Sequence, residues 1–345
     1  MELGKQIMNC RQEADLSQEE LAERIYVSRQ TISNWENDKS YPDVNSLVLL
    51  SEVFHISLDK LIKGDIDRMR EEMKIGIIGC GSMGRMLVEK FFESKSVSTE
   101  NLLVANRTQG KIMHLKDKCT VCESNREAVK EADIVFLCVR PVDMKDILSE
   151  IKDCLKEDSL LVSLNGSIMF EQIEQICKGK IAKAIPSVTA EVNQSQTLVC
   201  YNERVTEADK ECLTGLLSCM GTVIELPEQE MGMGSELVSC MPGFIAAIFQ
   251  ELCTSAKKHT TLSENEIVRM VLQTMVGTGT MMLEKEYSFE DVISRVATKG
   301  GITEEGTKVI QEQFPVVADD VFEKTLEKRR LTTDNAQRSF ERVGQ

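Results

Sequence analysis

In residues 73–92, MKIGIIGCGSMGRMLVEKFF, an apolar run leads directly into a glycine-rich turn. Ile75, Ile77 and Ile78 form a run typical of a strand buried in a parallel sheet. A GxGxxG motif and an amphipathic helix follow, and this order predicts a dinucleotide-binding Rossmann unit. The residues expected to hold the cofactor in this turn are Gly79, Gly81, Ser82, Met83 and Gly84.

The three glycines have separate roles in such a turn. The first permits the tight turn, the second lets the pyrophosphate approach the backbone, and the third lets the helix pack on the strand. The N-terminus of the helix attracts the anion. A bare glycine turn is the alternative, but later strand-like runs favour a complete α/β Rossmann domain over residues 73–230. Those runs lie at 102–105, 134–139, 160–164 and 181–185.

The end of the second strand bears on which cofactor is bound. Asn106, Arg107 and Thr108 follow this strand about 20 residues past the glycines, where NAD-binding proteins place an acidic residue on the ribose hydroxyl. No acidic residue stands there, and Arg107 suits a 2′-phosphate. We therefore expect NADP(H), with NAD(H) as the alternative if Arg107 only stacks on the adenine.

The N-terminal residues 1–65 have only helical periodicity and predict a small all-α domain. Ser17 and Glu20 have the spacing of a capping box, and Ser28 begins another helix after a tight turn at residues 26–28. Asp43 and Ser57 are expected to cap two further helices. Two short helices joined by a tight turn predict a helix-turn-helix.

Charge and composition limit the function classes. The chain has 345 residues and a formal net charge of −15, and residues 1–65 carry seven Lys or Arg against twelve Asp or Glu. Phosphate neutralisation supplies most non-specific DNA affinity, so this domain should bind DNA weakly unless it is dimerised. We find no apolar run of the roughly 18 residues needed to span a membrane and no signal peptide, which predicts a cytoplasmic protein without membrane contact.

The twelve cysteines do not indicate a disulfide framework or a metal site. They are scattered through a long chain without an export signal, so we expect reduced thiols in the core. Cys119 and Cys122 have CxxC spacing, but no second pair or histidine accompanies them. The three histidines lie outside the other motifs and are expected to be surface or packing residues, so no metal is predicted.

Residues 231–331 are expected to form an all-α domain that pairs two chains. Long amphipathic helices rarely bury both faces within one subunit, so they favour an intertwined homodimer. A polar linker is expected at residues 66–72 and a tail at 332–345. The predicted helices span about 233–258, 264–285, 289–297, 303–313 and 315–331.

The N-terminal stretch LSQEELAERIYVSRQTISNWENDKSYPD, residues 16–43, resembles the Cro/C1-type (XRE) helix-turn-helix family. The resemblance implies that the helix beginning near Ser28 enters the major groove of DNA. A protein-interaction domain that has lost DNA binding is the alternative. The residues implied to contact base edges or phosphates are Gln18, Arg29, Gln30, Ser33, Asn34 and Lys39.

Residues 73–331 resemble the pyrroline-5-carboxylate reductase family. The stretches that carry the resemblance are GIIGCGSMG (76–84), ADIVFLCVRPVDM (132–144), SELVSCMPGFIAAIF (235–249) and VATKGGITEEG (296–306). The resemblance implies that Thr303 donates a hydrogen bond to the imine nitrogen and that the loop before it binds the substrate carboxylate. The residues implied for that loop are Lys299, Gly300, Gly301 and Ile302; those implied for the nicotinamide side are Val139, Arg140, Pro141, Asn165 and Gly166.

Several positions depart from the family pattern. Lys299 replaces a proline, Ile302 replaces a small or hydroxyl residue, and AIPSVT (184–189) and SCMPGF (239–244) are altered. These departures resemble a divergent late-competence (ComER-like) branch of the family. We expect an NADP(H)-dependent reductase that converts 1-pyrroline-5-carboxylate to L-proline and carries a DNA-binding domain. The alternative is a DNA-binding regulator whose reductase domain senses NADP(H) or a metabolite.

Overall fold

The computed structural model describes residues 3–37, 39–58, 61 and 73–341. The linker expected at residues 66–72 and most of the helix expected after Ser57 lie outside these ranges. The chain divides into two compact units, which we describe separately. The first comprises Met1–Val135, Cys154–Ser159 and Glu207–Leu216, and the second comprises Phe136–Asp153, Leu160–Thr206 and Leu217–Gln345.

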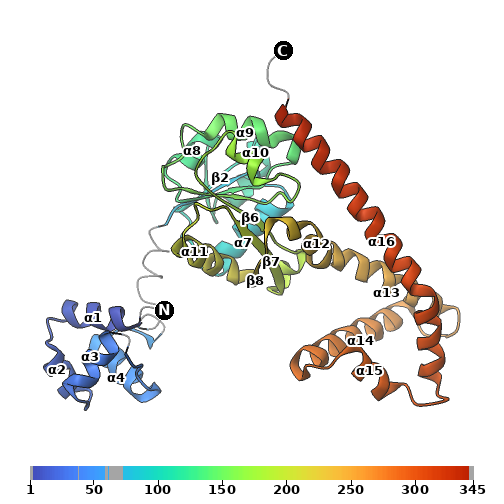
Figure 1. Cartoon of the computed structure of the whole chain (residues 1–345), viewed down its shortest axis with the longest axis horizontal. Helices are drawn as coiled ribbons and strands as arrows, with labels where there is room; N and C mark the ends of the chain where they lie inside the picture. The colour runs from blue at the N-terminus through green and yellow to red at the C-terminus, as the bar shows by residue number, and fades with distance from the viewer. Residues whose placement is uncertain (1–2, 38, 59–60, 62–72, 342–345) are drawn as a thin grey trace. The chain divides into compact units, whose positions relative to one another are not determined.

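The N-terminal domain is a helix-turn-helix, as the sequence predicts. Its helices are α1 (Leu3–Glu13), α2 (Gln18–Arg24), α3 (Arg29–Glu36) and α4 (Val44–Phe54) (Figure 1). The Ser17–Glu20 capping box is present at the start of α2, and the side chains of Ser28 and Asp43 cap α3 and α4. Apolar side chains around the buried Trp35 form the core of this domain.

The nucleotide-binding part is built on an eight-stranded sheet with the strand order β3-β2-β1-β4-β5-β6-β7-β8. In the first unit β1, β2 and β3 pair in parallel, with Ile75 opposite Leu102 and Leu103 opposite Thr120. The two-residue strand β3 was not predicted. The strands are β1 (Ile75–Ile78), β2 (Leu102–Ala105), β3 (Thr120–Val121), β4 (Ile134–Leu137), β5 (Leu160–Ser163), β6 (Lys180–Ile185), β7 (Ser195–Tyr201) and β8 (Gly221–Glu225).

In the second unit, one pair of neighbouring strands runs antiparallel. β5 and β6 are parallel, β6 and β7 are antiparallel, and β7 and β8 are parallel. Every residue of β4 and β5 is buried, which explains their uninterrupted apolar sequences. The helices that accompany the strands are α7 (Ser82–Glu93), α8 (Asn125–Lys130), α9 (Met144–Ile151), α10 (Phe170–Glu174) and α11 (Glu207–Leu217).

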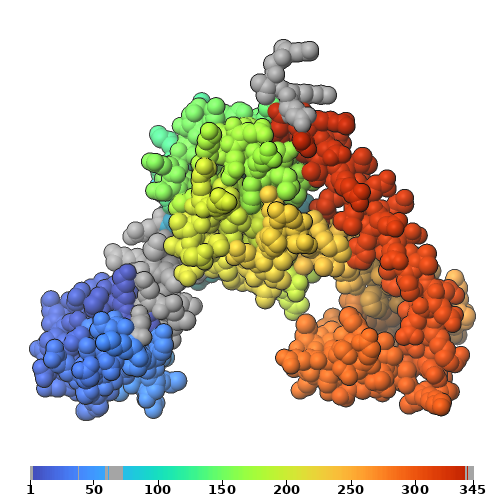
Figure 2. Space-filling view, viewed as in Figure 1, coloured from blue at the N-terminus to red at the C-terminus, as the bar shows by residue number. Residues whose placement is uncertain are grey.

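The C-terminal part of the second unit is helical. It comprises α12 (Met231–Ser235), a π-helical turn (Glu236–Cys240), α13 (Met241–Lys257), α14 (Glu264–Lys285), α15 (Phe289–Val296) and α16 (Ile302–Glu341). Figure 2 shows the orange surface of α14 and α15 open to solvent on the visible face. Many of their large apolar side chains are exposed, among them Met270, Val276, Leu283 and Phe289.

Two expectations for the C-terminal region are wrong. The two helices expected at 303–313 and 315–331 are one helix, α16, which continues through Pro315. The proline ring removes one backbone hydrogen bond from the helix but does not end it. Residues 332–341 are not a tail but the last turns of α16. Ala336 and Phe340 are buried there, and Lys145 Nζ donates a hydrogen bond to the Phe340 carbonyl oxygen at 3.1 Å.

The expectation that no segment is long and apolar enough to span a membrane is also wrong. The helical stretch Glu228–Lys257 has 30 residues, and an 18-residue window within it reaches a mean hydropathy of 1.5, which suffices by length and composition. A helix whose apolar side chains pack against another chain has the same composition, so the segment by itself does not indicate a membrane.

Candidate cofactor and substrate site

The glycine-rich turn has the geometry that a dinucleotide requires. Gly79 adopts a positive φ of 86°, and Gly81 directly precedes α7, which has no side-chain cap at its N-terminus. A Cβ added at Gly81 would meet no atom within 4 Å, whereas Gly84, in the first turn of α7, is buried. The backbone N–H groups at the start of α7 are thus open to an anion, and this fits the pyrophosphate of NADP.

Asn106 connects this turn to the end of β2. Its side-chain Oδ1 accepts a hydrogen bond from the Cys80 backbone N–H at 3.1 Å, and its Nδ2 donates to the Thr108 carbonyl oxygen at 2.9 Å. Asn106 therefore positions the glycine turn relative to the residues that follow β2. Burial raises the pKa of the Cys80 thiol to about 11, so the thiol adds no negative charge beside the turn.

Arginines stand both after β2, where the 2′-phosphate is expected, and in the first turns of α7. Arg107 and Thr108 are exposed after β2. Arg85, in the first turns of α7, lies with its Nη2 3.4 Å from Nε2 of His114. Sequence reasoning did not single out Arg85; it expected His114 to be a surface or packing residue, and His114 is exposed. An arginine directly after the third glycine was the signal that could have identified Arg85.

The remaining predicted cofactor residues lie in the second unit. Val139 and Pro141 are half-buried, and the exposed Arg140 forms an ion pair with Asp143, with 2.9 Å between Nε and Oδ2. That hydrogen-bonded pair raises the pKa of Arg140. Asn165 is buried directly after β5, where its Oδ1 accepts a hydrogen bond from the Ser167 backbone N–H at 2.9 Å. The Oδ1 atom of Asn165 thus holds the loop after β5 in place, and its Nδ2 group is left to bind a ligand.

A buried ion pair joins α16 to the π-helical turn. Glu236 is 1% exposed, and its Oε1 accepts hydrogen bonds from Nε and Nη2 of Arg329 at 3.0 and 2.8 Å. Arg329 also lies against the loop after β5, because its Nη1 is 3.5 Å from the position of a Cβ added at Gly166. No sequence pattern indicated this pair, whose members are 93 residues apart.

The loop before α16 differs from its expected arrangement. Gly300 has a positive φ of 72°, and its backbone N–H donates to Glu304 Oε2 at 2.5 Å. The Gly301 N–H donates to the Thr298 carbonyl oxygen at 2.8 Å. The two N–H groups expected to hold a substrate carboxylate are therefore engaged within the chain. Lys299 and Ile302 are exposed, and Thr303 is half-buried in the first turn of α16.

Thr303 and Asn165 are not neighbours within one chain. Arg329 places its part of α16 beside Gly166, and Thr303 precedes Arg329 by 26 residues on the same helix. At about 1.5 Å per residue, the two positions on α16 are roughly 39 Å apart. The residues assigned to the imine nitrogen and to the nicotinamide side therefore cannot act on one substrate within a single chain.

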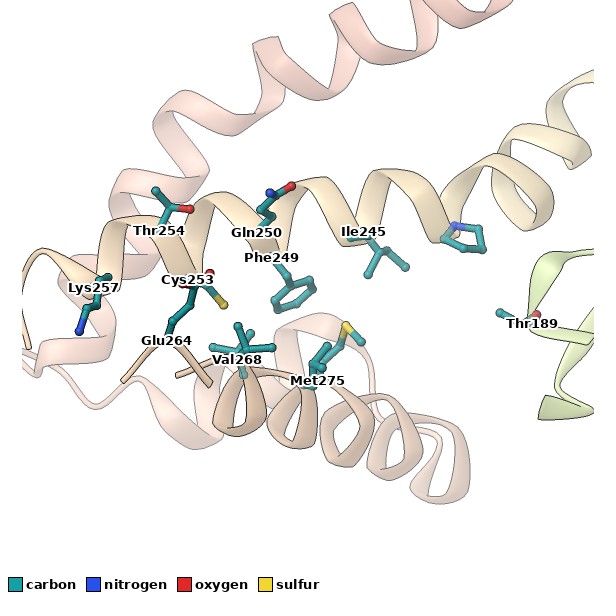
Figure 3. A pocket seen from close by; sticks show the side chains of 14 residues that line it. Thr189, Ile245, Phe249, Gln250, Cys253, Thr254, Lys257, Glu264, Val268 and Met275 are labelled. Carbon is teal, nitrogen blue, oxygen red and sulfur yellow. The ribbon is translucent and has the colours of Figure 1, made fainter. Parts of the chain in front are cut away.

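An apolar groove lies between α13 and α14 (Figure 3). It has a volume of about 780 Å³, and Phe249 on α13 faces Val268 and Met275 on α14 across it. Lys257 and Glu264 bring charged groups to one end of the groove. An apolar groove between helices with exposed apolar faces is suited to receive a helix of another chain.

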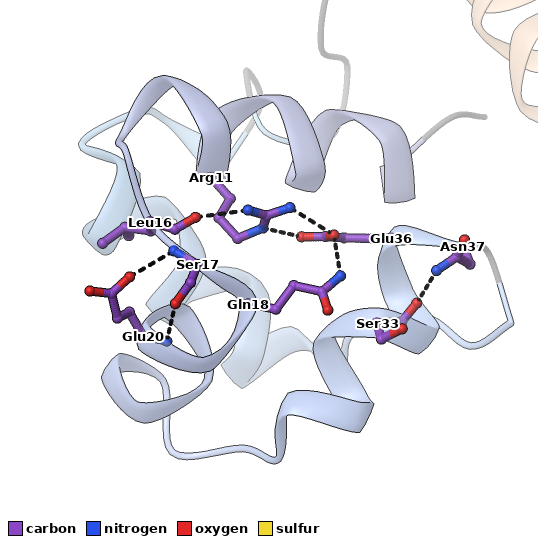
Figure 4. Close-up of polar contacts among 8 residues, drawn as sticks. All are labelled: Arg11, Leu16, Ser17, Gln18, Glu20, Ser33, Glu36 and Asn37. Carbon is purple, nitrogen blue, oxygen red and sulfur yellow. Dashed lines mark hydrogen bonds and ion pairs between the residues drawn. The ribbon is translucent and has the colours of Figure 1, made fainter.

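In the helix-turn-helix domain, a buried carboxylate organises the predicted DNA-contacting surface (Figure 4). Glu36 accepts hydrogen bonds from Nε and Nη2 of Arg11 at 2.6 and 3.1 Å, and Gln18 Nε2 donates to its Oε2 at 2.8 Å. Gln18 can therefore offer a phosphate only its second amide hydrogen. This network was not predicted, because Arg11 and Glu36 are far apart in the sequence.

The other predicted DNA-contacting residues gather on and just after α3. Arg29 and Gln30 are exposed, Ser33 and Asn34 are half-buried, and Lys39 is exposed. Gln30 Nε2 donates to Asn34 Oδ1 at 3.1 Å, which pairs two of the candidate side chains one helical turn apart. The surface of α3 is thus polar and open, as recognition of base edges requires.

The cysteines are thiols, and none of the twelve is exposed: five are buried and seven are half-buried. Burial raises the pKa of Cys119 to about 12 and that of Cys122 to about 11. Both therefore remain protonated thiols at neutral pH, which disfavours metal binding or redox chemistry. Among the residues that the structure describes, no group of three or more potential ligands could hold a metal ion.

Three family descriptions match the chain in succession. Residues 7–61 match "Helix-turn-helix", residues 74–166 match "NADP oxidoreductase coenzyme F420-dependent", and residues 228–331 match "Pyrroline-5-carboxylate reductase dimerisation". These matches confirm the three predicted parts and their order. The dimerisation match also covers the apolar stretch Glu228–Lys257.

Individual proteins agree with these matches. Pyrroline-5-carboxylate reductase 3 of Bacillus subtilis is 34% identical over 264 residues, which cover 76% of this chain and 97% of that protein. ComE operon protein 4 of the same organism is 30% identical, covering 73% and 94%. The structure of a pyrroline-5-carboxylate reductase from Coxiella burnetii has a TM-score of 0.66 at 25% identity, covering 77% of this chain and 98% of that one.

Proposed function

The chain belongs to the pyrroline-5-carboxylate reductase family, and we propose that it is an NADP(H)-dependent imine reductase that converts 1-pyrroline-5-carboxylate to L-proline. The observation that carries the proposal is the match over 97% of a reductase of this name. The glycine turn at the open N-terminus of α7 supports it, because this is where the cofactor pyrophosphate would bind. NADPH supplies the hydride, and the protein contributes binding and orientation.

The chain's own residues have limited chemistry to perform. Thr303 donates its hydroxyl hydrogen to the imine nitrogen and so orients the carbon that accepts the hydride. Arg107 and Thr108 hold the 2′-phosphate, while Asn106 fixes the turn that holds the pyrophosphate. The assignments of Val139, Arg140, Pro141 and Asn165 to the nicotinamide side remain predictions from the family resemblance.

The active unit is a homodimer in this proposal. A separation of roughly 39 Å along α16 keeps Thr303 from the loop after β5 in its own chain. A second chain can supply Thr303 if the apolar groove of α13 and α14 and the exposed side chains around it pair two copies. The same pairing buries the apolar stretch Glu228–Lys257, and we place the protein in the cytoplasm on that basis.

Turnover provides the first test. Full-length protein is mixed with NADPH and 1-pyrroline-5-carboxylate, and cofactor oxidation is followed by absorbance beside an NADH sample. Thr303→Ala should lower turnover by at least tenfold while leaving NADPH affinity unchanged, since it removes one hydrogen bond to the reacting imine. Turnover that does not depend on Thr303 contradicts its assigned role, and its complete absence contradicts the reductase proposal.

The helix-turn-helix domain supports a second proposal, that the protein binds DNA and that its reductase part senses NADP(H). The observation in its favour is the polar surface of α3, on which Arg29 and Gln30 are exposed. Coupled sites influence each other reciprocally, so DNA affinity should change when NADPH is added. A genome-wide pull-down with and without NADPH tests this, and recovery of no preferred sequence in either sample contradicts it.

A further inference from the structure

The ion pair between Glu236 and Arg329 has a feature that stability alone does not explain. Glu236 Oε1 accepts both hydrogen bonds from Arg329, and the buried Oε2 atom has no hydrogen-bond partner among the residues that the structure describes. A buried charged oxygen without a partner destabilises a fold, and apolar residues of similar volume are often at least as stable as a buried ion pair. Glu236 also begins a π-helical turn, an irregularity that is frequent at functional sites. These observations point to a role other than stability.

The side chain of Arg329 lies beside both α12 and the loop that follows β5. Its Cδ is 3.4 Å from the position of a Cβ added at Gly232, and its Nη1 is 3.5 Å from that of a Cβ added at Gly166. Glu236 engages the Nε and Nη2 atoms of the planar guanidinium. Because a planar group held at two atoms has a defined orientation, Nη1 is kept at the backbone of Gly166.

The π-helical turn is also joined to the loop that follows β6. Ser239 Oγ donates a hydrogen bond to the Pro186 carbonyl oxygen at 3.1 Å, directly after the last residue of β6. In open α/β sheets, ligands bind outside the carboxyl ends of the strands. Asn165, at the carboxyl end of β5, is proposed for the nicotinamide side. Arg329 and the π-helical turn thus support two loops at the edge of the sheet where this half of the cofactor is proposed to bind.

We propose that Arg329 is a positioning residue for the nicotinamide half of NADP(H), and that it acts by holding the loop of Asn165 and Gly166 in place. Arg107 and the glycine turn, which are proposed for the adenosine half, belong to the first unit, whereas Arg329 and Gly166 belong to the second. Loss of Arg329 therefore weakens the binding of the nicotinamide half alone. The inference rests on the proposed use of NADP(H) and deepens it, because the family resemblance gave Arg329 no role.

The test compares Arg329→Met with Arg330→Met. The variants remove one positive charge from neighbouring positions of α16, but Arg330 is exposed. Each full chain is titrated in a calorimeter with NADPH and with 2′-phospho-ADP-ribose, which lacks the nicotinamide ring. The measured quantity is the Kd for 2′-phospho-ADP-ribose divided by the Kd for NADPH. Arg329→Met should lower this ratio about tenfold by weakening NADPH binding alone, an effect comparable to the loss of one hydrogen bond, and Arg330→Met should leave it unchanged.

A double variant keeps the test decisive if Arg329→Met does not fold, since that change alone leaves Glu236 buried and unpaired. Arg329→Met with Glu236→Met removes both charges and should keep the wild-type Tm while showing the same lowered ratio. A wild-type ratio in the double variant overturns the role of Arg329, because the unpaired charge of Glu236 then explains the single variant. An equal loss of affinity for both ligands overturns it as well, because the defect is then a general one of structure.

The binding ratio does not depend on turnover. If the ratio falls as expected and no imine is reduced, the reductase proposal fails and the role of Arg329 stands. If the wild-type protein binds 2′-phospho-ADP-ribose as tightly as NADPH, the loop after β5 contributes nothing to binding, and the role of Arg329 is overturned. If the wild-type protein binds neither ligand, the cofactor proposal is wrong and the role of Arg329 is wrong with it.

Discussion

A heterodimer made from two inactive chains provides a stringent test of the dimeric active site. One chain carries Thr303→Ala, and the other carries Gly81→Asp. Gly81 is exposed in front of α7, and a Cβ there meets no atom within 4 Å, so the aspartate fits sterically. Its negative charge would stand where the pyrophosphate binds and would repel the cofactor. Each parent homodimer should therefore be nearly inactive.

The expected activity follows from the geometry of α16. Thr303 is roughly 39 Å from the part of this helix that contacts Gly166, which exceeds the reach of any side chain. If Thr303 acts on the cofactor of the other chain, the heterodimer has one site with an intact glycine turn and an intact Thr303. Its second site lacks both. Turnover per dimer should therefore be half that of the wild type, with KM unchanged.

The assay uses two affinity tags and sequential purification, so that only mixed dimers are measured. A heterodimer of wild-type and Thr303→Ala chains serves as the control and should also show half the wild-type turnover. Activity of the doubly mutated heterodimer no higher than that of its parents refutes the reasoning. In that case Thr303 acts within its own chain, and α16 must bend or break to allow it.

Three further predictions address stability and assembly. Glu228→Gln leaves the fully buried Lys183 without its ion-pair partner, whose Oε1 lies 2.6 Å from Lys183 Nζ. The free energy of unfolding should fall by about 3–5 kcal/mol. In calorimetry this corresponds to a fall of roughly 6–20 °C in the Tm of the reductase part. The double variant Lys183→Met with Glu228→Met should recover most of the lost Tm. Hydrogen bonds from Ser17 and Ser46 lower the pKa values of Glu20 and Asp43, so the helix-turn-helix domain should lose stability as the pH falls below about 4. Trp35 is the single tryptophan of the chain, and its fluorescence reports the unfolding of this domain. Fluorescence that does not change during an acid titration contradicts the prediction. Ile245→Glu in the groove should give a monomer in light scattering, whereas Ser255→Glu on the same helix should stay dimeric.

Local sequence patterns were sufficient for the elements whose determinants are adjacent in the chain. The spacing of Ser17 and Glu20 predicted the start of α2, and the glycines after β1 predicted the turn before α7. In these cases the hydrogen-bonding partners are at most a few residues apart. The hydrogen bond from the Gly300 N–H to Glu304 is equally local, because the two residues are four apart. A glutamate four residues after a glycine at the start of a helix was a signal that the sequence did offer.

Contacts between distant residues had no such signal. The pairing of Arg329 with Glu236 and of Lys183 with Glu228 depends on how separate elements pack, and charge alone does not indicate which residues meet. The continuity of α16 is a further example. Proline at residue 315 favours a break, but packing of the last turns around Phe340 and Lys145 stabilises the helix beyond it. Tertiary contacts thus override a local preference.

The proposed homodimer of the reductase part also bears on the acidic helix-turn-helix domain. With twelve acidic and seven basic residues, one such domain gains little from the DNA backbone. Two domains held on one dimer act at an effective concentration of the order of millimolar, which can raise the combined affinity by about 10²–10⁴-fold. Eleven residues separate Leu61 from Met73, and a chain of this length can extend to about 40 Å, which exceeds the roughly 34 Å between half-sites one DNA turn apart. A change such as Ile245→Glu, which separates the reductase chains without touching the DNA-contacting surface, should therefore weaken binding to a paired site by a similar factor. If DNA binding is unaffected by the loss of the dimer, each domain recognises DNA alone and the acidic charge is overcome by contacts to bases.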